Sequence, residues 1–382
     1  MVLHQKLNFV TNCWREYDDD FGKDGAKIGS TLRIRLPNQY LTSLGAAITP
    51  QDTVETSTTL AITQQRNVPL QFLSSELTLS IDDFSERIIE PAAAVLASGI
   101  EADALNMVND VSNSVGTPGT PPTDFFGLYM SSKATLDLNL APQSQRYMIV
   151  GPFASANVLT SLKGLFNPQD TISKQYHEGV MGRTADYDWY MNTLLPSFTP
   201  GTNLTGVSVT GGGQTGASLI TGGWAAAQTV KKGQVFTLAG VFQVHPETKQ
   251  STGVLQQFTV TADQTAAGAA MTLAISPSIV TTGAYQNVSN SPAGATPLVF
   301  VGTASTAYTQ AIGFHKQAFT FAAPPLFMPK GVDMGSRQTM DGISMRLIRD
   351  YVPTSDLLIT RLDVLYGYKT IRPQLACRVV TS

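Results

Sequence analysis

Apolar and polar residues alternate along several separate stretches of the chain. The first stretch pairs three aliphatic side chains with two arginines in strict alternation: Leu32, Arg33, Ile34, Arg35 and Leu36. A period of two places the aliphatic side chains on one face of a β-strand, and two further extended stretches follow at 53–63 and 68–73. Little apolar sequence lies nearby for a local core, and a two-stranded ribbon alone is only marginally stable in water. The pattern therefore predicts a two-stranded ribbon that reaches out and lies on another subunit, with residues 32–36 in that contact.

A helical period replaces the alternation between about residues 82 and 112. Ser80 or Asp82 can cap the start of this helix. Pro91 either bends the helix or marks a break near its beginning, because proline lacks the N–H that an interior position needs. An unbroken helix over 82–112 would be roughly 45 Å long, which is typical of a structural spine. The period rests on apolar residues three and four positions apart: Phe84, Ile88, Ala92, Val95, Leu96, Ile100, Ala104, Leu105, Val108 and Val111.

The composition of the chain changes at about residue 198. Before that point, 147–150 has the pattern of a buried strand and 154–162 that of a short helix. From 199 to 311 the sequence is rich in Gly, Thr, Ala and Val, which favours a small all-β barrel or sandwich. Mixed composition returns after 312, so 199–311 is predicted to be inserted within another domain. Its strand-like stretches are separated by turn residues: 206–210, 234–238, 257–261, 271–275 and 298–301.

Three more strand-like stretches follow the insertion, at 318–321, 343–348 and 357–368. Each is rich in aromatic and branched aliphatic residues, which favour strands. We expect them to complete the sheet begun before the insertion.

Charge is scarce along the 382 residues. Asp, Glu, Lys and Arg together make up 14%, and the formal net charge is −3. A protein that reads duplex DNA normally carries a basic stripe or patch, whereas Lys231 and Lys232 form the one adjacent basic pair of the sequence. Any contact with nucleic acid is therefore expected to be weak and without sequence preference. Abundant Gly, Ala, Thr and Ser with so little charge suit a β-rich subunit whose neighbours cover its surface.

The cysteines and the apolar runs indicate the compartment. Cys13 and Cys377 cannot build a disulfide framework, and neither stands in a metal-binding spacing. No apolar run approaches the ~20 residues that a membrane span needs, and the first residues are too polar for the core of a signal peptide. The sequence therefore predicts no membrane contact, buried or unremarkable thiols, and synthesis and assembly in the cytoplasm.

The sequence contains no pattern that is typical of an enzyme. Neither a GxSxG nucleophile turn nor a Walker loop occurs, and the glycine-rich stretch 211–216 is predicted to be a flexible turn. The acidic run 18–20 is predicted to be solvated, because successive side chains of an extended chain alternate faces and cannot converge on one ion. The histidines are far apart and follow no zinc-binding spacing: His4, His177, His245 and His315. We expect no catalytic residue, no metal and no cofactor.

The order of these elements and several local stretches resemble the major capsid (coat) proteins of tailed bacteriophages, in the branch whose subunit carries an inserted β-barrel. The order is a polar arm, a β-ribbon, a spine helix, a mixed domain, an inserted β-domain and a strand-rich end. The resemblance covers essentially the whole chain, and the ordered series carries it rather than one motif. Such proteins often have a longer helical arm before the position that Val2 matches. The similar stretches are 25–37, 76–87, 113–119, 192–196, 231–241 and 365–373.

The resemblance implies an α+β fold of the tailed-phage major capsid type. Its parts would be an N-terminal arm, an extended β-hairpin loop, a peripheral domain with the spine helix, the first part of an axial domain, an inserted all-β barrel, and a C-terminal part shared by the axial and peripheral domains. In chain order the expected bounds are 1–26, 27–75, 76–123, 124–198, 199–311 and 312–382.

The same resemblance implies a structural protein and not an enzyme. Its subunits would self-assemble into hexamers and pentamers of the icosahedral head that encloses a double-stranded DNA phage genome. The implied partners are other copies of the chain, a scaffolding protein and a portal, with packaged DNA contacted weakly and non-specifically. The expected location is the virion shell, assembled in the cytoplasm of the host bacterium.

Two other hypotheses stay open. A tail-tube or decoration protein would also be β-rich and low in charge, but such proteins rarely need a helix as long as 82–112. A carbohydrate-active β-protein would need a pair of carboxylates facing a cleft, and the acids of 199–311 are Glu247 and Asp263 alone.

Overall fold

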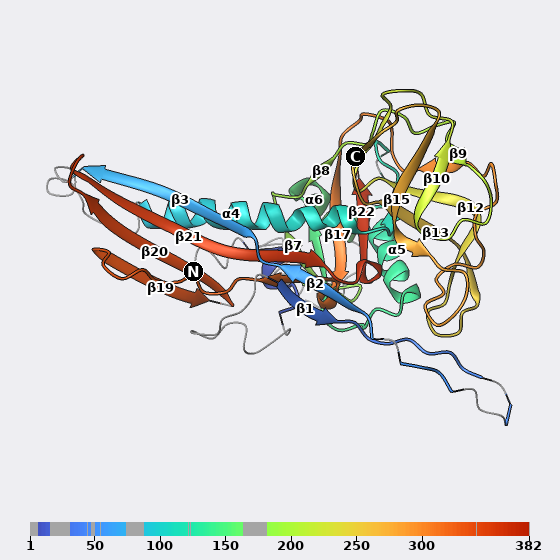
Figure 1. The fold of residues 1–382 in the computed structure, drawn as a ribbon, viewed down its shortest axis with the longest axis horizontal. Helices are drawn as coiled ribbons and strands as arrows, with labels where there is room; N and C mark the ends of the chain where they lie inside the picture. Colours follow the sequence, from blue (N-terminus) through green and yellow to red (C-terminus); the bar gives the residue numbers. More distant parts are fainter. Residues whose placement is uncertain are drawn as a thin grey trace. The chain divides into compact units, whose positions relative to one another are not determined.

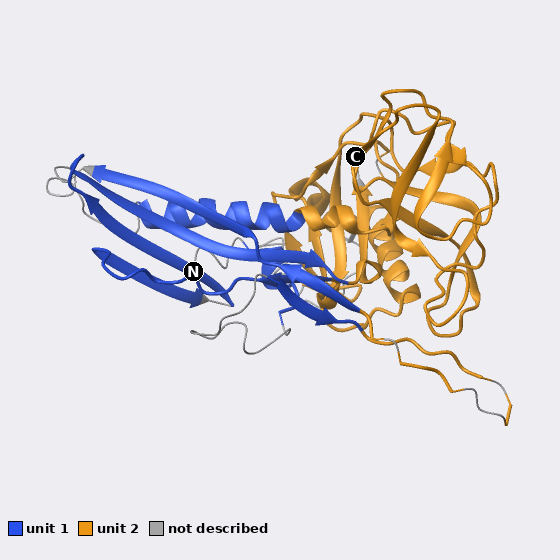
Figure 2. Cartoon of the chain, viewed as in Figure 1, with its two compact units in different colours: residues 1–36, 57–105, 319–371 blue, residues 37–56, 106–318, 372–382 orange. Residues whose placement is uncertain are grey.

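The protein folds into two compact units, which Figure 2 shows in different colours. Unit 1 contains Met1–Leu36, Ser57–Leu105 and Phe319–Ile371, and unit 2 contains Pro37–Thr56, Asn106–Ala318 and Arg372–Ser382. The predicted six-part division is finer than these two units and stays a prediction. The structure is a computed structural model, and it describes residues 7–15, 31–43, 45–46, 50–53, 55–73, 88–120, 122, 124–162, 182–340 and 342–381.

A five-stranded antiparallel sheet forms the main part of unit 1 (Figure 1). Strand β21 lies between β20 and β3, and its last residues pair with β18, while β19 pairs with β20. The predicted strands at 318–321, 343–348 and 357–368 are confirmed as β18, β20 and β21, and they share a sheet with β3, which precedes the insertion. The strands are β3 (Gln64–Leu73), β18 (Phe319–Ala322), β19 (Met334–Met340), β20 (Ile343–Val352) and β21 (Leu357–Thr370).

Strand β3 has a different partner from the one predicted. The sequence placed 68–73 in the ribbon, whereas the structure pairs β3 with β21 along its whole length, with Leu70 opposite Thr360. The ribbon itself consists of β1 (Thr31–Arg35) and β2 (Ser57–Ala61), which run antiparallel. Alternation along β3 identifies a strand but does not select its neighbour, because both candidate partners offer the same backbone groups.

Helix α4 spans Glu90–Leu105 and continues into a 3₁₀-helix, η2, at Asn106–Asp110. The prediction of a helix over 82–112 is correct in kind, but the last turns are 3₁₀ and residues 81–87 lie outside the described part of the chain. Pro91 is the second residue of α4, where its missing N–H costs nothing. Sixteen residues give a length of roughly 24 Å. The helix packs on β3 and β21. Its buried residues are small or aliphatic and include Ala93, Leu96, Ala97, Ile100 and Ala104.

A central mixed sheet in unit 2 has the strand order β4-β22-β17-β5-β7-β6, and β8 also pairs with β17. The predicted strand at 147–150 is confirmed as β5, and the predicted helix at 154–162 is confirmed as α6 (Pro152–Leu162). The other helix of this part is α5 (Phe125–Leu138). The strands are β4 (Ser114–Val115), β5 (Arg146–Val150), β6 (Arg183–Thr184), β7 (Tyr187–Met191), β8 (Ser197–Phe198), β17 (Tyr308–His315) and β22 (Ala376–Thr381).

A second sheet of unit 2 is built from the stretch rich in glycine and threonine. Its order is β16-β12-β13-β15-β10-β9, and β11 pairs with β14 beside it. All five predicted strand positions overlap observed strands, whereas β10 was not predicted; closure of the sheet into a barrel stays a prediction. Fully buried Leu219, Phe236, Phe258 and Leu273 belong to its core. The strands are β9 (Ser208–Val209), β10 (Gly216–Gly222), β11 (Thr229–Val230), β12 (Val235–Val244), β13 (Ser251–Val260), β14 (Gln264–Thr265), β15 (Ala270–Ile279) and β16 (Leu298–Phe300).

Short helical turns complete the described elements. They are α2 (Asn8–Thr11), which precedes the ribbon, η3 (Lys316–Ala318), between β17 and β18, and η4 (Pro373–Leu375), between β21 and β22.

Candidate functional site

The aliphatic side chains of strand β1 lie in the core of unit 1. Leu32 and Ile34 are 7% and 4% exposed, because they pack with Leu60 and further apolar residues of this chain. We expected this apolar face to cover a neighbouring subunit. Since the chain covers the face itself, Leu32 and Ile34 are structural residues of unit 1, and a contact through β1 stays a prediction only for its other face.

That other face of β1 is polar and exposed. Arg33 and Arg35 lie there, and Leu36, which follows the strand, is half-buried. Arg33 donates a hydrogen bond from Nε to the hydroxyl of Ser57 on β2, at 2.9 Å. The exposed face of β1 is therefore polar and not aliphatic.

A polar cluster joins α4 to the sheet of unit 1. Arg66 on β3 donates to both carboxylate oxygens of Asp103 on α4, at 2.6 and 2.7 Å. The hydroxyl of Tyr366 on β21 donates to the same carboxylate. Burial opposes ionisation of Asp103, but the hydrogen bonds from Arg66 and Tyr366 outweigh it and hold the pKa of this carboxyl below its usual value.

Asp363 is a second carboxylate of unit 1, and it is fully buried. Arg346 donates to its two oxygens at 2.9 and 2.6 Å, and Arg361 forms an ion pair with it at 2.9 Å. Gln65 on β3 adds a further hydrogen bond of 2.9 Å. A buried charge is tolerated when it is paired and hydrogen-bonded, so this cluster fixes the register of β3, β20 and β21.

The first described residues are attached to α4 by a buried carboxylate. Glu101 accepts hydrogen bonds from the backbone N–H groups of Phe9, at 2.6 Å, and Val10, at 3.1 Å. Farther along, the N–H of Trp14 donates to the carbonyl of Phe319 at 2.9 Å. Residues 7–15 are thus held at two points of unit 1.

A buried guanidinium joins the two sheets of unit 2. Arg378 on β22 donates to the carbonyl of Gly233 at 2.7 Å, to Gln310 on β17 at 3.1 Å and to Thr259 on β13 at 3.2 Å. It also donates to the carbonyl of Val111. Burial lowers the pKa of Arg378 to about 10, so the side chain is still charged at neutral pH. One side chain therefore fixes the β-rich stretch to the central sheet.

His315, at the end of β17, is buried among positive charges. Burial and the nearby Arg146, Arg372 and Lys316 lower its pKa to about 4. The imidazole is therefore neutral near pH 7, and its Nδ1 accepts a hydrogen bond from the N–H of Gln317 at 3.3 Å.

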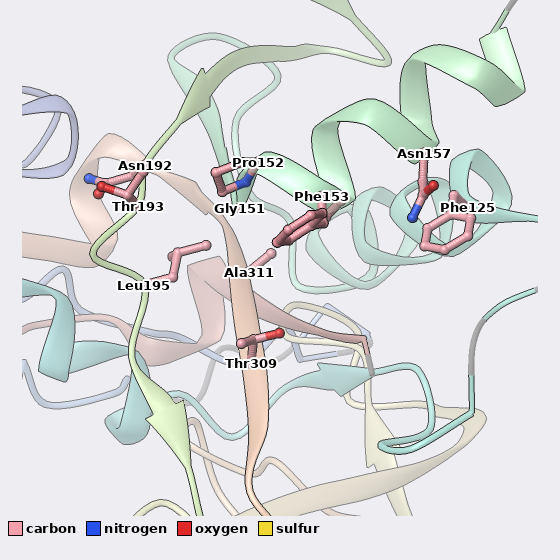
Figure 3. A pocket seen from close by; sticks show the side chains of 11 residues that line it. Phe125, Gly151, Pro152, Phe153, Asn157, Asn192, Thr193, Leu195, Thr309 and Ala311 are labelled. Carbon is pink, nitrogen blue, oxygen red and sulfur yellow. The ribbon is translucent and has the colours of Figure 1, made fainter.

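Unit 2 has an apolar pocket at the start of α6, with a volume of about 240 Å³. Figure 3 shows the ring of Phe153 and the side chain of Leu195 on either side of Ala311, with Thr309 nearby. Phe153 is 88% exposed. Its ring therefore forms a rim of the pocket that the chain does not cover.

The described residues hold no arrangement typical of catalysis. Among them, no three His, Cys, Asp or Glu side chains converge on a point that could hold a metal ion. Burial raises the pKa of Cys377 to about 12, which keeps the thiol protonated and unreactive. His245 accepts hydrogen bonds from two backbone N–H groups of its own turn. His4, His177 and the acidic run 18–20 lie outside the described residues, and no described helix has the length and apolar character to cross a membrane.

Sequence reasoning missed the residues that organise these sites. Arg378 has a visible signal, since it is a single charge in the otherwise apolar stretch 376–380, and such a charge must find polar partners once it is buried. Glu101, in the apolar period of α4, has a similar signal. Phe153 has none, because an exposed and a buried phenylalanine look the same in a sequence.

Comparison with known proteins gives a family for the second half of the chain. Residues 195–379 match the family described as P22 coat protein - gene protein 5. The matched range begins beside the apolar pocket and includes the β-rich sheet, Asp363 and Arg378. A comparison with curated proteins gives no match.

Solved phage structures are similar to the chain at low identity. A structure titled Mycobacterium phage Che8 is 11% identical with a TM-score of 0.48, over 96% of this chain and 89% of that chain. The capsid structure of the Cyanophage P-SCSP1u is 11% identical with a TM-score of 0.45, over 93% and 84%. The mature capsid of bacteriophage PhiM1 is 9% identical with a TM-score of 0.45, over 92% and 82%. Because all three TM-scores are below 0.5, no conclusion about this chain is drawn from these structures. Over residues 195–379, just under half of the chain, this protein is similar to the P22 coat protein family.

Proposed function

We propose that this chain is the major capsid protein that assembles into hexamers and pentamers of an icosahedral head around a double-stranded DNA phage genome. The match of residues 195–379 to the P22 coat protein family is the observation that carries the proposal. Closed symmetric assembly repeats the same interfaces many times. Modest affinity at each contact therefore suffices, because a subunit is held by several neighbours at once.

The described segments 37–43 and 50–53 support a contact with a neighbouring copy. Gln51 bonds both backbone groups of Leu41: its Nε2 donates to the carbonyl at 2.6 Å, and the N–H of Leu41 donates to its Oε1 at 2.9 Å. Tyr40 and Leu41 are exposed beside these two hydrogen bonds. Two chain segments joined in this way have no core of their own, so their exposed apolar side chains are expected to be covered by another subunit. Arg33 and Arg35 precede the segments in sequence and would add polar contacts.

In this proposal, residues 199–311 are the inserted all-β domain of the coat subunit. Its own core and the buried Arg378 support that assignment. The inserted domain would stabilise the subunit or mediate contacts between capsomers. The other expected parts keep the bounds 1–26, 27–75, 76–123, 124–198 and 312–382.

The proposed partners follow from the same role. A net charge of −3 gives little attraction for phosphates, so packaged DNA would be contacted weakly and non-specifically. A scaffolding protein would guide assembly, a portal would occupy one vertex, and the shell would form in the host cytoplasm.

Electron microscopy tests the proposal directly. The particulate fraction of cells that express the chain, with and without its neighbouring phage genes, should contain round shells or polyhedral fragments of uniform wall thickness. Long tubes of narrow bore would contradict the proposal and indicate a tail component. A subunit that stays monomeric under both conditions would contradict it in favour of a decoration protein.

A further inference from the structure

Phe153 is the most exposed large hydrophobic residue in the described part of the chain, at 88%. It follows Pro152 at the start of α6, directly after β5. Met191, which is 56% exposed, ends β7. Strands β5 and β7 run parallel and pair Val150 with Met191. Phe153, three residues after Val150, and Met191 therefore lie at the same end of the central sheet. An apolar patch results at the carboxyl ends of these two strands.

A hollow lies directly beside this patch. Its walls come from three places: the start of α6, the segment 192–195, and β17, which contributes Thr309 and Ala311 (Figure 3). The segment 192–195 is held in place because the N–H of Asn192 donates to the carbonyl of Val150 at 2.9 Å. Asn192 in turn accepts a hydrogen bond from the N–H of Leu194 at 2.8 Å. The walls are therefore preformed and do not depend on an occupant.

The chemistry of the hollow restricts what can fill it. None of the eleven residues that line it is charged, so it offers no cationic side chain to the phosphates of a nucleic acid. Its volume of about 240 Å³ is smaller than the ~300–1,000 Å³ of sites for cofactors and other small molecules. The hollow therefore suits a single apolar side chain. A second copy of this chain provides such a side chain, because each copy carries an exposed Phe153 at the edge of the same patch.

We propose that Phe153 of one copy inserts into the hollow of an adjacent copy in the same capsomer ring. Each subunit then supplies one aromatic side chain and one hollow, which is a head-to-tail contact that closes into a ring. Aromatic residues that fill a desolvated pocket at the centre of an interface often dominate its affinity. The inference rests on the proposed capsid function and specifies one contact between its subunits.

A pair of variants tests the contact from both sides. Phe153→Ser removes the inserted ring, and Thr309→Phe fills the hollow that receives it. Each should lower the fraction of protein in sedimenting shells at least about tenfold, while the thermal unfolding of the soluble subunit stays unchanged, because both positions are exposed. The matched control is Phe327→Ser, which removes another phenylalanine of high exposure, at 76%, and should assemble as the wild type does.

Three results would overturn the inference. They are normal shell formation by Phe153→Ser, normal shell formation by Thr309→Phe, and an equal loss of assembly in Phe327→Ser, which would mean that exposed apolar surface matters in general. Failure of the wild-type chain to form shells at all would instead refute the proposed function. The two failures are thus distinguishable in one set of sedimentation profiles.

Disulfide trapping then identifies the partner of Phe153. Small fractions of subunits with Phe153→Cys and with Thr309→Cys are co-assembled with an excess of wild-type subunits, which maintain the shell, and are then oxidised; the native Cys13 and Cys377 are buried and do not interfere. Covalent dimers should form in shells that contain both variants and not in shells that contain only one of them with wild type. Dimers of Phe153→Cys with itself would indicate a two-fold contact and would contradict the head-to-tail arrangement, as would the absence of dimers from mixed shells.

Discussion

Arg66 holds the carboxylate of Asp103 with two hydrogen bonds of 2.6 and 2.7 Å. The two residues come from β3 and α4, and Tyr366 on β21 donates to the same carboxylate. Three elements that are distant in sequence therefore meet at one charged group. This cluster, and not the apolar period of α4 alone, determines how the helix is seated on its sheet.

Replacing Asp103 with asparagine should lower the free energy of unfolding by about 1 kcal/mol, since the pair is partly exposed. Because the pKa of Asp103 is lowered in the folded protein, the wild type gains this stability above about pH 4 and loses it as the pH falls further. Chemical denaturation at pH 7 and pH 3 should therefore show a larger difference between wild type and variant at pH 7 than at pH 3. Asp333→Asn, at an exposed position that faces Arg349 at 3.5 Å, is the control and should change little at pH 7.

Replacing Glu101 with glutamine should release residues 7–15 from α4. The amide retains one acceptor oxygen in place of two, and one buried N–H then loses its partner, which costs about 1–3 kcal/mol. Hydrogen exchange at the amides of Phe9 and Val10 should accelerate more than exchange in β20 or β21. Glu90→Gln, at an exposed site on the same helix, should leave these rates unchanged; unchanged rates in Glu101→Gln would show that the carboxylate is not what holds the segment.

Replacing Arg378 with methionine should be among the most destabilising single changes in unit 2. The substitution leaves the buried carbonyls of Gly233 and Val111 without a hydrogen-bond donor. The free energy of unfolding should fall by about 3 kcal/mol or more. Thermal unfolding followed by calorimetry measures this loss. Arg183→Met removes an exposed arginine that bonds one carbonyl and should change the unfolding temperature little. Equal effects of the two substitutions would contradict a joining role for Arg378.

His315 should make the protein sensitive to mild acid. An unfolded histidine binds a proton below about pH 6.5, whereas the folded side chain does so only at about pH 4. Acid therefore favours the unfolded state between these values, and stability should fall by roughly 3 kcal/mol across that range. Denaturation curves at pH 7 and pH 4.5 should show the loss in the wild type and in His245→Asn, but much less of it in His315→Asn. If the stability of His315→Asn falls between pH 7 and pH 4.5 as much as that of the wild type, other groups cause the loss.

The two faces of β1 should respond differently to substitution. Leu32→Asp places a charge in the core of unit 1 and should destabilise the subunit by about 3 kcal/mol or more. Arg33→Ala, on the exposed face, should change the unfolding free energy by less than about 0.5 kcal/mol and reduce shell formation. Unfolding and sedimentation of the same preparations separate the two effects. A stable Leu32→Asp subunit, or normal shells from Arg33→Ala, would refute the corresponding assignment.

Local periodicity predicted the kind of most elements. The strands at 147–150, 343–348 and 357–368 and the helix at 154–162 were visible in the sequence because alternation and helical spacing reflect neighbouring residues only. The change of composition near residue 198 likewise marked the β-rich stretch that later forms a sheet with its own core.

The tertiary structure alone decided which surface each element covers. The alternation in β1 showed that Leu32 and Ile34 share a face, but not that this chain buries it. Similarly, β3 was recognisable as a strand, whereas its partner β21 begins at Leu357, far along the chain. The lone charge of Arg378 signalled burial, but its four acceptors come from separate segments. Periodicity records how a side chain relates to its neighbours in sequence, while burial and partnership depend on contacts between distant segments, and those exist only once the chain has folded.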